Sequence, residues 1–213
     1  MQRKQRTTWL LAGICAAVWV WSGIQPEDRL TWGLEQIASV LVIAALLLQR
    51  GVRYSTGSLA MLAVLFCAHT AGTHYTYSLT PYDAWFQALT GQSLDAALGW
   101  QRNNYDRVVH FLWGLCMTQP MLETLEQRLR CTFRASANLS FHVVLSTSAL
   151  YELLEWAAAV VFGEGGQAYL GTQGDVWDAQ ADIAIALAGW ALVILFRLVR
   201  GAAPAISARP PDG

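Results

Sequence analysis

The chain has 213 residues, of which 54% are hydrophobic and only 14% are charged. A soluble domain of this size contains roughly a quarter charged residues, so the composition excludes an ordinary soluble protein. The net charge of −1 carries no information about nucleic acid. No basic stretch interleaved with aromatic residues indicates nucleic-acid binding, so we expect no nucleic-acid partner.

The apolar residues are grouped in blocks, most of which approach the roughly 17–25 residues needed to cross a bilayer. The first block follows a basic start but has no cleavage site of the small-x-small kind after it, so we predict an uncleaved helix there. The sequence predicts an all-α, polytopic transmembrane helix bundle with about six spans, forming a single integral membrane domain over residues 1–200. The predicted spans are Thr8–Ile24, Leu30–Gln49, Ser58–Tyr77, Val108–Leu122, Leu139–Phe162 and Val176–Val199.

The basic residues orient these spans. If the N-terminus lies inside, the inner segments hold eleven of the 14 Lys and Arg residues, and the outer segments hold only Arg29, Arg102 and Arg107. This bias predicts that both termini face the cytoplasm. The chain ends in a tail, residues 201–213, that we predict to be disordered and cytoplasmic.

The connections carry further expectations. The long outer connection Leu79–Arg107 contains several Trp and Leu residues, which predicts a short helix at the level of the lipid headgroups. Pro120 is expected to kink or end the fourth span. The four cysteines lie in spans or in an inner loop, so we expect free thiols without a disulfide framework.

Ionisable residues inside a bilayer are costly and by default suggest function. In chain order, the third to the sixth spans each place such residues toward the outer face. The inner halves hold few polar groups, mainly Glu35, Gln119 and His142. Four spans are therefore predicted to bring their ionisable residues to one leaflet. These residues are His69, His74, Asp106, His110, Glu152, Glu155, Asp175, Asp178 and Asp182.

The spacings refine this set. Asp106 and His110 are four residues apart and share a helix face, whereas His69 and His74 are about 140° apart on a helix. We rank His69, the deeper of the two, above His74. Asp175 lies at a helix start, where an aspartate is also favoured simply as a cap. Any one of these residues alone would more often make an interhelical hydrogen bond or a headgroup contact.

Several acids in one low-dielectric pocket would repel each other strongly if all were ionised. Protonation, pairing with an arginine such as Arg102 or Arg107, or a divalent cation would each relieve this repulsion. Histidine and carboxylates from several helices are ligands suited to Zn, Mn or Fe. The metal ligands would be His69, Asp106, His110, Glu152, Glu155, Asp178 and Asp182, with catalytic roles for His110, Glu155 and Asp178.

Three functions fit these residues. The first is a metal-dependent membrane enzyme that acts at the outer leaflet on a lipid or lipid-linked envelope precursor. The second is a proton- or ion-coupled transporter, because clustered carboxylates also serve proton relays. The third is a structural envelope protein. The bilayer is the partner common to all three, and the sequence does not set an oligomeric state.

Four strings together resemble one known family: "HTAGTHYTY", "NNYDRVVHF", "YELLEW" and "YLGTQGDVWDAQADI". In this order they are similar to the YjdF family of bacterial inner-membrane proteins. The resemblance implies a bacterial inner-membrane location and about six spans, and it brings no activity.

A more distant similarity is to VanZ-like membrane proteins, which are associated with glycopeptide-antibiotic resistance. They share the string formed by Asp106, Arg107, His110 and Phe111. The chain differs from them at Glu155, where a glutamine would be expected, and lacks the asparagine that follows the aspartates of their final helix.

Overall fold

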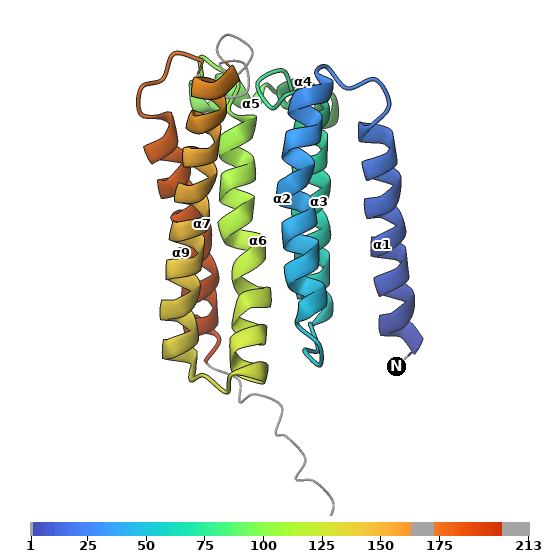
Figure 1. Ribbon diagram of the computed structural model, residues 1–213, viewed down its shortest axis with the longest axis vertical. Helices are drawn as coiled ribbons and strands as arrows, with labels where there is room; N and C mark the ends of the chain where they lie inside the picture. The colour runs from blue at the N-terminus through green and yellow to red at the C-terminus, as the bar shows by residue number, and fades with distance from the viewer. Residues whose placement is uncertain (1, 163–172, 202–213) are drawn as a thin grey trace, which may run out of the picture.

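The computed structural model describes residues 2–162 and 173–201, and every regular element in these ranges is a helix. Six long helices run side by side, and two short helices lie across one end (Figure 1). The all-α prediction is confirmed for this part of the chain, and each predicted span falls on a long helix. The long helices are α1 (Gln2–Ser22), α2 (Arg29–Leu48), α3 (Thr56–His74), α6 (Tyr105–Arg128), α7 (Phe133–Phe162) and α9 (Asp178–Val199).

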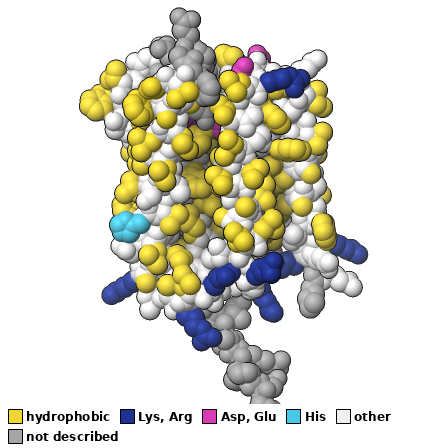
Figure 2. All heavy atoms as spheres, viewed as in Figure 1, with side chains coloured by type: hydrophobic (Ala, Val, Ile, Leu, Met, Phe, Trp, Pro, Cys, Tyr) yellow, Lys and Arg dark blue, Asp and Glu magenta, His cyan; other side chains and the backbone are white. Residues whose placement is uncertain are grey.

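Four of these helices are long and apolar enough to cross a membrane: Arg29–Leu48, Thr56–His74, Phe133–Val161 and Asp178–Val199. Their side chains present many exposed Leu, Ile, Val and Trp residues, and Figure 2 shows this apolar surface over the middle of the molecule. Such a surface suits contact with lipid chains instead of water. The chain is therefore a membrane protein with several apolar spans.

The two ends of the bundle differ. Helices α4 (Tyr82–Thr90) and α5 (Leu94–Leu98) lie at one end, which we name the cap end. Most of the visible Lys and Arg side chains gather at the other end, which we name the basic end (Figure 2). The first described residue and the end of α9 both lie at the basic end (Figure 1). Apart from Gly201, the predicted tail 201–213 lies outside the described residues.

The helices pack unequally. Helix α6 makes its most extensive contact with α9, and α7 packs against both. Helix α3 connects this group to the N-terminal helices, because it contacts α6 on one side and α1 on the other. Helix α1 thus packs on α3 more than on α2, its neighbour along the chain, although a short turn joins α1 to α2.

The close contact between α6 and α9 depends on two glycines. A Cβ atom on Gly114 would lie 1.7 Å from the carbonyl oxygen of Ala186, and one on Gly189 would lie 2.3 Å from the carbonyl oxygen of Phe111. The two backbones therefore touch where neither glycine has a side chain. Small residues allow this close approach between membrane helices.

Pro120 does not end its helix. Helix α6 continues past it to Arg128, so of the two expectations the end of the helix at Pro120 is wrong, and the kink stays a prediction. Beyond Pro120 the helix is held by the turn between α2 and α3. The side chains of Glu123 and Gln127 accept hydrogen bonds from the backbone N–H groups of Ser55 and Arg53, both at 2.9 Å. These contacts offset the backbone hydrogen bond that proline cannot donate.

Two short helices, not one, form the long connection at the cap end. Asp83 in α4 accepts hydrogen bonds from the backbone N–H groups of Leu94 and Asp95 and so caps α5. The hydroxyl of Tyr82 donates to the carboxylate of Asp95 and accepts a 3.1 Å hydrogen bond from the backbone N–H of Asn104. The predicted short helix is thus present as a pair that is tied to the start of α6.

Replacing Tyr82 by phenylalanine is expected to lower the free energy of unfolding by about 1 kcal/mol near neutral pH, because both hydrogen bonds are lost. Burial raises the pKa of Tyr82 to about 12, and the hydrogen bond to Asp95 adds to the rise. The contribution of Tyr82 is therefore complete below pH 10 and is lost as the pH rises through about 12. Thermal unfolding at pH 8 and pH 11.5 would measure both effects.

The matched control is Tyr75→Phe. Tyr75 also lies at the cap end, but its hydroxyl makes no hydrogen bond to any residue that the structure describes. This variant should unfold like the wild type at both pH values. Equal midpoints for Tyr82→Phe and Tyr75→Phe would show that the Tyr82 hydrogen bonds do not hold the cap.

Candidate metal centre

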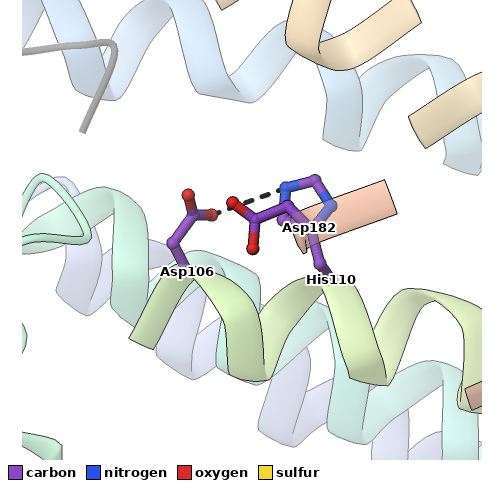
Figure 3. A group of neighbouring side chains, drawn as sticks. All are labelled: Asp106, His110 and Asp182. Carbon is purple, nitrogen blue, oxygen red and sulfur yellow. Dashed lines mark ion pairs between the residues drawn. The ribbon is translucent and has the colours of Figure 1, made fainter. Parts of the chain in front are cut away.

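Three ionisable side chains from two helices meet near the cap end. Asp106 and His110 lie on the first two turns of α6, and Asp182 lies on the second turn of α9. One ligand atom from each of the three lies within 4.8 Å of the others. Figure 3 shows the two carboxylates and the imidazole pointing toward one another. The contact of Gly114 with Ala186, one turn beyond His110 and Asp182, sets this separation.

Asp182 has an unusual environment. Its residue is only 1% exposed, and neither carboxylate oxygen makes a hydrogen bond to the described part of the chain. The Nε atom of Arg107 lies 3.8 Å from its Oδ1. A buried carboxylate without hydrogen bonds is costly. Its two oxygens therefore lack the compensation that a bound cation would give them.

Glu152 extends the group onto a third helix. Its Oε1 lies 3.2 Å from Nε2 of His110, and Oδ1 of Asp106 lies 3.6 Å from the same nitrogen. The imidazole of His110 thus faces acids from α6, α7 and α9. Glu155 lies one turn further along α7 and is also buried, but it is outside the group of three ligand atoms.

The other two aspartates of α9 are paired with arginines. Asp178 forms an ion pair with Arg102, and its Oδ1 lies 3.5 Å from Nη2 of Arg107. Asp175 accepts a 2.5 Å hydrogen bond from Arg107 and a 2.9 Å one from the backbone N–H of Trp177. These two contacts lower the pKa of Asp175. The arginine pairing expected from the sequence is therefore present. The N-cap of α9 is Trp177, and Asp175 binds the backbone N–H of that residue instead of capping the helix.

The two histidines of α3 lie outside the group. Nε2 of His69 is 3.3 Å from the carbonyl oxygen of Glu35, and Nδ1 is 2.5 Å from the hydroxyl of Tyr77. Both ring nitrogens of His69 thus have partners. His74 contacts the carbonyl oxygen of Ser22 through Nδ1 at 3.0 Å and packs against the ring of Trp21.

Glu35 is placed differently from the expectation. It was expected among the polar groups of the inner side, and this is wrong. Its Oε2 accepts a 2.5 Å hydrogen bond from the hydroxyl of Tyr151, next to Glu152, so Glu35 lies on the same side as the candidate centre. The signal for this was its position on the second turn of a span that begins at the outer end.

The comparisons with known proteins agree with this picture. The family model described as "Predicted membrane protein (DUF2238)" matches residues 7–202. The chain belongs to this family. It is also 35% identical over 180 residues to the inner membrane protein YjdF of Escherichia coli strain K12, a match that covers 83% of this chain and 82% of the relative. No solved structure matches.

Family membership confirms the resemblance seen in the four sequence strings. The relative is an inner-membrane protein, and the chain has four helices apolar enough to span a bilayer. The chain is thus a multi-pass protein of the bacterial inner membrane.

Proposed function

We propose that the chain is a metal-dependent membrane enzyme that acts at the outer leaflet on a lipid or a lipid-linked envelope precursor. One observation carries this proposal. Asp106, His110 and Asp182 bring their ligand atoms within 4.8 Å of one another, and the buried carboxylate of Asp182 has no hydrogen bond from the described residues. A divalent cation would satisfy that carboxylate and offset the repulsion between the acids.

The donor set fits a transition metal. One imidazole nitrogen and two carboxylates suit Zn, Mn or Fe. Such an ion would supply a polarised water for hydrolysis. Glu152 lies beside His110, and its Oε1 makes no hydrogen bond within the described ranges. We assign Glu152 as the group that takes a proton from that water, and Asp178 as the anchor of Arg102 and Arg107 at the entrance. Glu155 and His69 stay predictions as further ligands.

The placement at the outer leaflet follows from charge. Lys and Arg gather at the basic end (Figure 2), and basic residues favour the cytoplasmic side. The candidate centre lies toward the opposite, cap end. Helices α1 and α6 run parallel to the four apolar spans (Figure 1). We therefore propose six spans with both termini in the cytoplasm and the centre toward the outer face.

Metal analysis of the detergent-purified protein tests this proposal. The wild type should contain close to one equivalent of metal, and His110→Ala and Asp182→Ala should lose it. The matched control is His142→Ala, because His142 is a histidine of α7 that is not one of the three grouped ligands. Metal-free wild-type protein that cannot be loaded with Zn²⁺ or Mn²⁺ would reject the proposal.

A proton- or ion-coupled transporter is the alternative, followed by a structural envelope protein. Transport needs a polar path to the basic end. Glu35 does not contribute to such a path, because it lies beside Tyr151, and Gln119 is already bonded to Arg197 at 3.2 Å. Ion flux in proteoliposomes that depends on a pH gradient, without bound metal, would favour transport.

A further inference from the structure

A second buried polar cluster lies beside the candidate metal centre. It connects helices α2 and α3 to helix α7. Glu35 on α2 is only 2% exposed. Its carboxylate accepts a 2.5 Å hydrogen bond from the hydroxyl of Tyr151 on α7, and its backbone carbonyl faces His69 on α3. Helix α2 otherwise packs mainly on α3. The Glu35–Tyr151 bond is thus a long-range connection from α2 to the helix that carries Glu152.

Tyr151 in turn touches His110. The rings of His110 and Tyr151 are in an edge-to-face arrangement, with centroids 5.8 Å apart and an interplanar angle of 75°. Glu152, the next residue of α7, contacts Nε2 of the same imidazole. Helix α7 therefore contacts His110 in two ways, through the aromatic ring of Tyr151 and through the carboxylate of Glu152.

The orientation of His110 matters for the centre. The imidazole is one of three ligand groups, and metal ligands are held in place by neighbours that fix the ring and its tautomer. No backbone carbonyl or hydroxyl is hydrogen-bonded to His110 within the part of the chain that the structure describes. The ring of Tyr151 is a neutral neighbour of His110, and the hydroxyl of Tyr151 is hydrogen-bonded to Glu35.

Burying the carboxylate of Glu35 costs free energy unless hydrogen bonds compensate it, and the bond from Tyr151 is one such compensation. A neutral residue would serve packing better at this depth of a membrane helix. Ser39, one turn further along α2, is also buried but makes no hydrogen bond through its hydroxyl within the described ranges. A polar group on this face of α2 is therefore not sufficient for a bond to α7, whereas Glu35 is long enough to reach Tyr151.

We propose that Glu35 is a positioning residue for the metal centre: it anchors the hydroxyl of Tyr151, and the ring of Tyr151 holds the imidazole of His110 toward Asp106 and Asp182. This inference rests on the proposed function for its consequence, which is metal affinity. The other consequence of the inference, a fixed orientation of the His110 ring, does not depend on any metal. Through Glu35, helix α2 contributes to the site although it provides no ligand.

The test uses the full-length protein in detergent and two readouts. The first is the set of imidazole NMR resonances of His110 in metal-free protein with labelled histidine, assigned with His110→Ala. The second is the affinity for Co²⁺, followed by its visible absorption. The variants are Glu35→Ala, Glu35→Gln and Tyr151→Phe, and the matched control is Ser39→Ala.

We expect Glu35→Ala and Tyr151→Phe to shift the His110 resonances and to weaken Co²⁺ binding by about 10-fold, as residues that orient a metal ligand do. Glu35→Gln keeps an oxygen that accepts from Tyr151, so it should match the wild type, as should Ser39→Ala. A merely structural role would lower the thermal midpoint without moving the His110 resonances.

Unchanged His110 resonances in Tyr151→Phe, which keeps the ring and is the variant most certain to fold, would overturn the inference. Wild-type protein that binds no Co²⁺ would instead reject the proposed function. In that case the NMR comparison still decides the role of Glu35, so the two failures are distinguishable.

Discussion

Replacing Gly114 by alanine is expected to cost about 3 kcal/mol or more in the free energy of unfolding and to abolish metal binding. The added Cβ atom would lie 1.7 Å from the carbonyl oxygen of Ala186 and 2.7 Å from its carbonyl carbon. These are backbone atoms, so no side-chain rotation relieves the clash, and overpacking of this kind is destabilising. Helices α6 and α9 have to separate, and His110 and Asp182 move apart with them.

Thermal unfolding in detergent and Zn²⁺ binding by the folded fraction would measure this effect. Gly189→Ala should behave in the same way, because its Cβ would lie 2.3 Å from the carbonyl oxygen of Phe111. The controls are Gly13→Ala and Gly33→Ala, on helical positions with nothing within 4 Å. They should unfold like the wild type or slightly later, since alanine favours helices. A normal midpoint for Gly114→Ala would contradict the close packing of α6 on α9.

The same two glycines show what the sequence could not predict. The apolar blocks and their lengths predict the helices, because length and hydropathy depend on each block alone. Which helices pack together depends on contacts between distant segments. Gly114 and Gly189 are two of the 17 glycines, and the sequence does not distinguish them from Gly13 or Gly33, which face open space.

The candidate centre was predictable in outline. A positive-inside count places the ends of the spans, and this led to the expectation that Asp106, His110, Glu152 and Asp182 lie at one level. The structure brings these four together. The count does not resolve which face each residue occupies, so it could not show that the two ring nitrogens of His69 face the Glu35 carbonyl and the Tyr77 hydroxyl.

The aspartates of α9 show the same limit. Asp175, Asp178 and Asp182 share one helix face by spacing, and the sequence treats them as one acidic row. In the structure the first two meet Arg107 and the second also meets Arg102. Asp182 lies one turn deeper and receives no hydrogen bond from the described residues. Arg107 comes no closer to Asp182 than 3.8 Å, which is beyond hydrogen-bond distance. The lengths of the two arginine side chains decide which acids they bind, and the sequence does not contain those distances.

Asp182→Asn is expected to make the metal-free protein more stable while it abolishes metal binding. In the metal-free wild type the carboxylate is buried without a hydrogen bond from the described residues, at a cost of about 1–2 kcal/mol. A side-chain amide has no charge, and its NH₂ group can donate to a neighbouring carboxylate. With a chelator present, the variant should therefore unfold at a higher temperature than the wild type. Free Zn²⁺ at 100 times its Kd should stabilise the wild type by about 2.7 kcal/mol and leave the variant unchanged.

Asp178→Asn is the matched control, because it makes the same chemical change one turn earlier on α9. Asp178 is paired with Arg102 and lies 3.5 Å from Arg107, so this variant should lose about 2 kcal/mol through weaker charge-assisted hydrogen bonds. With chelator present, a stability change of opposite sign in the two variants would distinguish their roles: Asp182 would be an acid kept for a ligand, and Asp178 an acid stabilised by the arginines. If both variants are destabilised equally, Asp182 serves stability like its neighbour, and the metal centre loses its main support.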